Sequence, residues 1–246
     1  GQIFMDYNPS DEFHWIYDKV LTREDCTFIK STYLDNPFLP AETIKEIEQL
    51  KKLDANYWKI YGLGERGISE ATIYSHWQYC DVLPEGGDEF YGLDFGYNHP
   101  TVLVQGSLRD NDLYSDEVIY RTHLTNSDLI DEMNRLEVSK KIPIYADSAE
   151  PQRIEEIRRA GFWVVPADKD VEKGIDAIKS RAWYITKRSV NMLKEVKSYK
   201  WKEKDGAILD EPVKINDDGM DATRYGVHTH TRKQYPTAGI GRGDIL

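Results

Sequence analysis

The stretch Phe90-Tyr-Gly-Leu-Asp-Phe95 is a short run of strand-forming residues that reaches a carboxylate at Asp94. A second run, Ile142-Pro-Ile-Tyr-Ala-Asp147, ends in the same way. A third acidic stretch, Asn216-Asp-Asp-Gly-Met-Asp221, lies where the pattern predicts the start of a helix. Carboxylates at two strand ends and one helix start can converge although they are far apart in the chain. Such oxygen ligands suit hard cations such as Mg²⁺ or Mn²⁺, and paired ions of this kind hydrolyse phosphodiesters.

The residues around Asp94 predict a three-stranded antiparallel meander. Turn signals at 97–100 and 109–112 separate three apolar runs between residues 90 and 121. The apolar periodicity after them predicts helix, strand, helix, strand, helix, a hairpin at Asp205-Gly206, and a last helix from Asn216 or Asp217. Strands linked by helices run parallel. The predicted fold class is therefore α/β, with a mixed sheet of meander and parallel strands flanked by helices.

The helix predicted before the hairpin is defined by its apolar spacing. Ile175, Ile178, Ala182 and Ile185 are three or four residues apart, as on one face of a single helix.

Residues 1–86 differ in character from the rest and predict an N-terminal α/β fragment. Strands are predicted over 2–7 and 27–33, and a short helix over 10–20 capped by Ser10. A further helix should follow Pro40, with an apolar stripe of Ile44, Ile47, Leu50 and Leu53. These elements bury too little to stand alone, so they look like the tail of a larger domain.

Glycines and prolines place a domain boundary near residue 87. The stretch Pro84-Glu-Gly-Gly-Asp88 interrupts the pattern just before the first meander strand. Three parts are therefore predicted: residues 1–86, a main domain over 87–232, and a tail over 233–246.

The composition allows a folded core and argues against several classes of protein. Of 246 residues, 40% are hydrophobic and 30% are charged, which suits a globular domain with a water-exposed surface. Two cysteines, Cys26 and Cys80, argue against a disulfide framework and a thiolate metal site. The chain carries no signal-peptide pattern and no apolar run long enough for a membrane span. It reads as an intracellular protein, or a piece of one.

The charge distribution is uneven. A net charge of −11 and a pI near 5.1 count against nucleic-acid binding. A local basic stretch softens that objection, although a solvated charged face explains it equally well. Its members are Lys169, Lys173, Lys179, Arg181, Lys187, Arg188, Lys194, Lys197, Lys200, Lys202 and Lys204.

Each acidic residue also has an ordinary structural interpretation. Asp94 lies beside Gly96 and suits a turn, and Asp147 or Ser148 suits the cap of a helix that starts at Pro151. Acids in a first helical turn, such as Asp217 and Asp218, are favoured by the helix dipole. Asp221 lies one turn further in and is explained less well in this way. Only the joint placement of these acids indicates a metal site.

The motifs resemble the ribonuclease-H-like nuclease fold and, more narrowly, the large terminase subunit of tailed bacteriophages. The resembling pieces are Gly92-Leu-Asp-Phe-Gly96, Tyr145-Ala-Asp-Ser-Ala149 and Asp218-Gly-Met-Asp-Ala-Thr-Arg-Tyr225. In residues 1–86, Tyr7-Asn-Pro9, His14-Trp15 and the stretch from Ser31 to Pro40 are similar to the end of the family's packaging ATPase and its linker.

The resemblance implies a metal-dependent DNA endonuclease of a viral genome-packaging motor. In the implied mechanism Asp94 bridges two Mg²⁺ or Mn²⁺ ions, Asp147 binds one, and Asp218 or Asp221 binds the other, with the ions about 3.5–4 Å apart. The cut would free unit genomes from concatemeric DNA.

The resemblance also implies partners and a location. They are double-stranded DNA, a portal protein and a small terminase subunit, in the cytoplasm of the host cell and without a membrane. Recognition should be of the DNA backbone rather than of bases. The residues proposed to contact phosphates are Lys169, Lys173, Lys179 and Arg181.

Two departures from the family pattern limit these expectations. The sequence contains no Gly-x-x-x-x-Gly-Lys-Ser/Thr loop, so ATP hydrolysis by this chain is not expected, as if the ATPase half were not included. Asp218 stands where many members carry histidine, which leaves open whether Asp218, Asp221 or both bind the second ion.

Three further residues are assigned ordinary roles. Arg224 is expected to form a salt bridge with a neighbouring carboxylate, and His99 and His123 are read as turn and strand-end residues. Two alternative functions stay open: a recombinase or junction resolvase of the same fold, and a non-catalytic DNA- or portal-docking domain.

Overall fold

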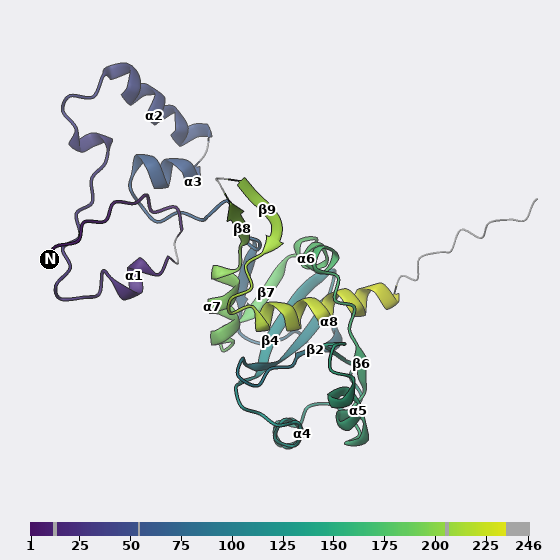
Figure 1. The fold of residues 1–246 in the computed structure, drawn as a ribbon. Helices are drawn as coiled ribbons and strands as arrows, with labels where there is room; N and C mark the ends of the chain where they lie inside the picture. Colours follow the sequence, from purple (N-terminus) through teal and green to yellow (C-terminus); the bar gives the residue numbers. More distant parts are fainter. Residues whose placement is uncertain (12–13, 54, 205–206, 235–246) are drawn as a thin grey trace, which may run out of the picture. The chain divides into compact units, whose positions relative to one another are not determined.

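The computed structural model describes residues 1–11, 14–53, 55–204 and 207–234 (Figure 1). The chain forms two compact units, one of Gly1–Ser75 with Trp201–Asp210 and one of His76–Lys200 with Glu211–Leu246. The predicted boundary near residue 87 falls inside the second unit, between its first two strands. No helix in the described ranges is both long and apolar enough to cross a membrane.

Residues 1–75 form short helices joined by extended segments. Thr32 and Asp35 make a capping box that starts one short helical turn, and the Arg66 guanidinium lies 3.7 Å from the centre of the Tyr17 ring. Pro40 directly precedes the longest helix, as predicted. The helical elements are α1 (Ile16–Lys19), η1 (Tyr33–Asp35), α2 (Ala41–Leu53), α3 (Ala55–Tyr57) and η2 (Trp58–Gly62).

The strands predicted over 2–7 and 27–33 are not formed. Neither segment pairs with another strand, Tyr33 instead begins the short helix η1, and Phe4 and Ile29 expose 84% and 82% of their surface. A strand needs a neighbour for its backbone groups, and the described residues of 1–75 contain no strand that could supply one. The helix predicted over 10–20 is shorter than expected: α1 is preceded by Trp15 as its N-cap and not by Ser10, and residues 12–13 of the predicted helix lie outside the described residues.

A seven-stranded mixed sheet is the centre of the second unit and confirms the predicted fold class. Its order is β1-β7-β4-β3-β2-β5-β6. The meander β2-β3-β4 is antiparallel, whereas β5, β6, β7 and β1 are added in parallel. The strands are β1 (Trp77–Cys80), β2 (Asp88–Asp94), β3 (Thr101–Arg109), β4 (Asp112–Arg121), β5 (Ile144–Ala146), β6 (Val164–Pro166) and β7 (Trp183–Thr186).

Helices cover the two faces of this sheet (Figure 1). On one face, α4 and α5 bury a core with residues of β2, β3, β5 and β6, in which Leu93, Leu129 and Ile157 are fully buried. On the other face, α8 packs on β2, β3 and β5 and against α6 and α7. The helices are α4 (Asn126–Arg135), α5 (Pro151–Arg159), α6 (Val171–Lys179), α7 (Val190–Ser198) and α8 (Asp218–Gln234).

Four of these elements, α6, β7, β1 and α7, differ from the prediction. The helix expected to run through Ile185 ends at Lys179, and the chain then forms strand β7. Strand β1 and helix α7 were not predicted. The two strands β8 (Trp201–Lys204) and β9 (Ala207–Pro212) pair as the hairpin signal predicts, although the turn residues 205–206 lie outside the described part.

Gly92 sets how closely α8 approaches β2. Residues alternate between the faces of a strand, so Gly92 and Asp94 share the face that α8 covers. A Cβ at Gly92 would lie 1.9 Å from the backbone oxygen of Ala222, and one at Gly226 would lie 3.3 Å from the Gly92 Cα. The backbones of strand and helix therefore touch directly, which brings the first turn of α8 next to the end of β2.

Candidate metal centre

The four predicted acids lie at one edge of the sheet and on the adjoining helix. Asp94 is the last residue of β2, and Asp147 directly follows β5. These strands are parallel neighbours, with Leu93 paired to Ala146, so their carboxyl ends meet. The Asp147 amide donates to the Leu93 oxygen at 3.0 Å. Asp218 and Asp221 lie in the first turn of α8.

The carboxylates act on one another electrostatically. Burial raises the pKa of Asp94 to about 8, and the charges of Asp221, Asp147 and Asp218 add to the effect in that order. The Lys169 ammonium lowers the pKa of Asp94. Burial also raises the pKa of Asp218, with the Asp217 charge as the next cause, while His99 lowers it. The four acids thus form one charge cluster, because distant carboxylates would not perturb each other in this way.

Basic side chains compensate part of this negative charge. The Lys169 Nζ lies 2.6 Å from Asp147 Oδ1. The Lys214 Nζ lies 3.0 Å from both Asp217 Oδ2 and Asp221 Oδ2. The Arg224 Nη2 lies 2.8 Å from Asp221 Oδ1, which confirms the salt bridge predicted for Arg224. The role of Lys214 was not predicted, because no local pattern distinguishes this lysine from any other.

The capping interpretation of Asp147 accounts for little of its position. Helix α5 begins at Pro151 with Glu150 as its N-cap, and no side chain makes the capping hydrogen bond. Asp147 Oδ1 instead accepts a hydrogen bond from the Ala149 amide at 2.8 Å, and its other short contact is with Lys169. Asp147 therefore closes a turn ahead of the helix and still points to the charge cluster.

The candidate ligands have the right chemistry for a divalent ion, but their carboxylate oxygens are too far apart in this structure to coordinate one ion together. All four candidates offer carboxylate oxygens, which Mg²⁺ and Mn²⁺ prefer. Among the residues that the structure describes, no three His, Cys, Asp or Glu side chains converge closely enough to hold an ion. The ion pairs described above supply positive charge that a bound cation would otherwise supply. Binding of a divalent ion would therefore require Lys169 to move away from Asp147 and Lys214 to move away from Asp221.

The four basic residues proposed to contact DNA have different surroundings. Lys169 belongs to the charge cluster itself, on the loop between β6 and α6. Lys173 forms an ion pair with Asp170 at 2.7 Å, and Lys179 is exposed in the last turn of α6. Arg181 donates to the carbonyl of Ala177 and to Ser180 Oγ, so it helps to end α6.

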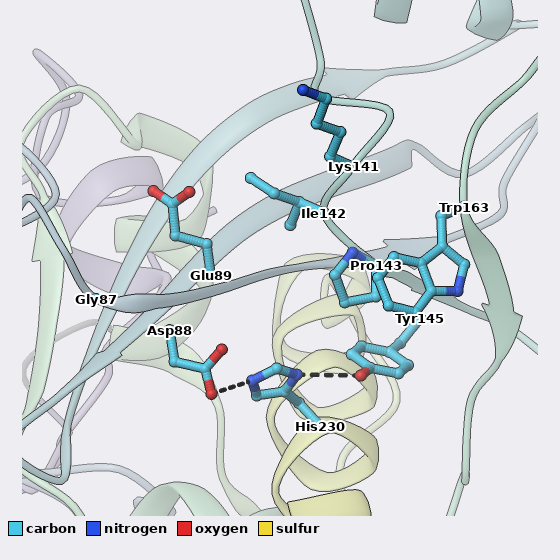
Figure 2. Close-up of a pocket in the computed structure, with 9 residues that line it drawn as sticks. All are labelled: Gly87, Asp88, Glu89, Lys141, Ile142, Pro143, Tyr145, Trp163 and His230. Atoms are coloured by element: carbon cyan, nitrogen blue, oxygen red, sulfur yellow. Dashed lines mark hydrogen bonds and ion pairs between the residues drawn. The ribbon is translucent and has the colours of Figure 1, made fainter.

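A pocket lies at the end of β2 opposite to Asp94 (Figure 2). Asp88 is six residues before Asp94, which is about 20 Å along a strand. Here His230 of α8 lies between Asp88 and Tyr145, with its Nε2 2.9 Å from Asp88 Oδ2 and its Nδ1 3.0 Å from the Tyr145 hydroxyl. These contacts tie the far half of α8 to the sheet, and the pocket is separate from the charge cluster.

Comparisons with known proteins agree with the predicted resemblance. Residues 1–65 match the family model described as Phage terminase large subunit. The chain is 24% identical over 229 residues to the PBSX phage terminase large subunit of Bacillus subtilis strain 168, a match that covers 86% of this chain and 53% of the relative. The predicted resemblance to phage terminase large subunits is thereby confirmed.

Solved structures show the same fold. The nuclease domain of the large terminase from bacteriophage SPP1, determined with bound Mn, matches with a TM-score of 0.57 and 21% identity over 65% of this chain and 98% of that domain. The large terminase of the thermophilic bacteriophage D6E matches with a TM-score of 0.54 and 24% identity over 89% of this chain and 60% of that protein. The predicted ribonuclease-H-like fold is confirmed. The chain spans about half to three fifths of these longer relatives.

Proposed function

Because this chain resembles phage terminase large subunits in sequence and in fold, we propose that it carries the metal-dependent endonuclease of a phage genome-packaging motor. The observation that supports the proposal is the charge cluster: Asp94 and Asp147 lie at the ends of two parallel neighbouring strands, and Asp218 and Asp221 lie in the first turn of α8, which packs on β2. Ligands of α/β sheets bind at the carboxyl ends of the strands. The proposed substrate is concatemeric double-stranded DNA. The proposed protein partners of this chain are a portal protein and a small terminase subunit.

The proposed division of labour follows the predicted parts. Residues 1–86 correspond to the end of the packaging ATPase and its linker, residues 87–232 to the nuclease, and residues 233–246 to a tail. The match of residues 1–65 to the family model supports the first assignment. The chain has no phosphate-binding loop motif, so it is not expected to hydrolyse ATP.

The residues of the cluster have distinct tasks in this mechanism. Asp94 ends β2, the strand that pairs with β5 and packs under α8, and it is therefore the candidate that would contribute to holding both ions. Asp147 would hold one ion, and Asp218 or Asp221 would hold the other. When bound, a pair of divalent ions lowers the pKa of the attacking water and stabilises the leaving oxygen. The Mn in the SPP1 domain supports Mn²⁺ or Mg²⁺ as the ion.

A nicking assay on supercoiled plasmid tests the proposal. We expect nicking with Mn²⁺ or Mg²⁺, none in EDTA, and a loss of about a hundredfold or more in Asp147→Asn, because a catalytic ion contributes several kcal/mol. Asp110→Asn is the matched control, since the Asp110 side chain is 91% exposed on the turn after β3.

The outcome also separates the alternatives. Equal cleavage by wild type and Asp147→Asn would contradict the proposed site. Absence of both cleavage and calorimetric Mn²⁺ binding at millimolar concentration would favour a non-catalytic docking domain. A marked preference for branched DNA would favour a resolvase.

The basic residues of α6 give a separate test of DNA binding. Reversing the charge of Lys173 and Lys179 should weaken binding at all sequences, because backbone contacts carry no sequence information. If both residues contact phosphates, the slope of log K against log salt should decrease by about 1.8. Binding is measured by fluorescence anisotropy at several salt concentrations, in EDTA to prevent cleavage. Lys141→Glu, at the other end of β5, is the control, and an unchanged slope in the double variant would place the DNA elsewhere.

A further inference from the structure

Glu195 is a buried carboxylate that holds the first turn of α8. It lies near the end of α7 and exposes only 2% of its surface. Its Oε2 accepts hydrogen bonds from the Gly219 amide at 2.8 Å and the Met220 amide at 3.1 Å, and its Oε1 accepts one from the Tyr120 hydroxyl at 2.7 Å. These two amides belong to the group that a helix leaves unpaired at its start.

Gly219 makes this contact possible. A Cβ at this position would lie 2.8 Å from Glu195 Oε2 and 3.1 Å from Met192 Cγ. Any larger residue between Asp218 and Met220 would push the carboxylate off the helix end. The glycine beside the candidate ligand Asp218 therefore has a steric reason.

A second glutamate uses the same contact at a place without candidate ligands. Glu117 of β4 accepts hydrogen bonds from the Asn191 amide at 3.0 Å and the Met192 amide at 2.8 Å, at the start of α7. Met192 and Val196 of α7 are fully buried, so this helix also has apolar contacts besides its cap. The two glutamates are thus alike as helix caps and differ in what their helices carry.

We propose that Glu195 is a positioning residue for the candidate metal centre, fixing the turn of α8 that presents Asp218 and Asp221 to Asp94. The proposal rests on the proposed function. The first turn of a helix frays when its amides lack partners, and a frayed turn would let both carboxylates move away from the ends of β2 and β5. The Tyr120 hydroxyl donates a hydrogen bond to the other oxygen of the Glu195 carboxyl group. Because Tyr120 belongs to β4, this bond links the first turn of α8 to the sheet.

The test compares two shortened glutamates. Glu195→Asp keeps the carboxyl group but withdraws it from the amides, whereas Glu195→Gln keeps an oxygen of the right reach. Glu117→Asp shortens the matching cap of α7. Mn²⁺ affinity is measured by electron paramagnetic resonance, and exchange of the Gly219 and Met220 amides is measured by NMR without metal.

We expect Glu195→Asp to bind Mn²⁺ at least tenfold more weakly, as is usual for groups that orient a ligand. Glu195→Gln should stay within about threefold and Glu117→Asp within about twofold of wild type, and exchange at Gly219 and Met220 should be faster only in Glu195→Asp. Wild-type affinity in Glu195→Asp, or an equal loss in Glu117→Asp, would overturn the proposal. If the wild type binds no Mn²⁺, the proposed function fails. In that case amide exchange still tests whether Glu195 fixes the first turn of α8. Unchanged exchange rates at Gly219 and Met220 in Glu195→Asp would refute that role.

Discussion

Replacing Asp94 with asparagine is expected to abolish metal-dependent cleavage and, without metal, to make the protein more stable. The two effects have one cause. Asp94 is held among the carboxylates of Asp221, Asp147 and Asp218, and burial together with their charges raises its pKa to about 8. A bound cation would offset the repulsion between these carboxylates. Without metal, the repulsion lowers the stability of the folded state. Asparagine removes both the repulsion and the central ligand.

The stabilisation should depend on pH with a definite sign. The folded pKa of about 8 lies above the ordinary value of 3.8, so the fold favours the protonated carboxyl. Asp94 therefore costs nothing below about pH 4, costs increasingly more between pH 4 and pH 8, and reaches a constant cost above pH 8. We expect Asp94→Asn to exceed the wild type by about 1–3 kcal/mol at pH 8.5, less than the full shift implies because the site can relax.

Urea unfolding in EDTA between pH 5 and pH 9 measures this difference. Asp110→Asn serves again as the control and should follow the wild type throughout. Adding Mn²⁺ should stabilise the wild type and leave Asp94→Asn unchanged. An Asp94→Asn variant less stable than the wild type at pH 8.5 in EDTA would mean that burial and the neighbouring carboxylates do not disfavour the charged form of Asp94.

The acids of this site could be predicted because each one marks the end of a regular element. Asp94 and Asp147 each close a run of strand-forming residues, and Asp218 and Asp221 open the last helix. Asp94 and Asp147 are neighbours because β2 and β5 pair in parallel; the sequence predicts parallel later strands but not which strand β5 joins. Local sequence is sufficient for such residues.

The partners of these acids could not be predicted in the same way. Lys214, Glu195 and Tyr120 carry no local signal, and their contacts join residues up to 75 positions apart. Only the packing of α7 and α8 on the sheet brings them together.

Strand β7 shows how a local pattern can mislead. The spacing of Ile175, Ile178, Ala182 and Ile185 suits one long helix, yet the helix ends at Lys179. Trp183 and Ile185 are two residues apart and both fully buried, because β7 lies between β1 and β4. Over so short a stretch, the spacing of apolar residues fits both a strand, with a period of two residues, and a helix, with a period of 3.6 residues. Pairing with neighbouring strands then decides which of them forms. Strand β1 was missed because it is only four residues long and exposes its middle two.

The second large effect is expected at Gly92, a residue that carries no charge and is not a candidate ligand. In Gly92→Ala the new Cβ would lie 1.9 Å from the Ala222 oxygen and 2.8 Å from the Ala222 carbonyl carbon. Both are backbone atoms of α8, so no side-chain rotation can relieve the overlap. The helix must move away from β2, which loosens the packing of both elements. We expect a loss of about 3 kcal/mol or more in the free energy of unfolding, at the upper end for overpacking by one methyl group.

The same displacement should weaken the metal centre. Asp94 lies two residues beyond Gly92 on the same face of β2, and Asp221 directly precedes Ala222 on α8, so a helix shift separates the two carboxylates. Gly92→Ala is therefore expected to lose Mn²⁺ affinity as well as stability, although it alters no ligand. Urea unfolding in EDTA and calorimetric Mn²⁺ titration measure the two effects. Gly86→Ala is the control, because its Cβ would meet no atom within 4 Å and its φ of +72° predicts only the ordinary cost of about 1–2 kcal/mol. A Gly92→Ala variant as stable as this control would show that α8 does not rest on the strand backbone, and the convergence of the acids would lose its structural basis.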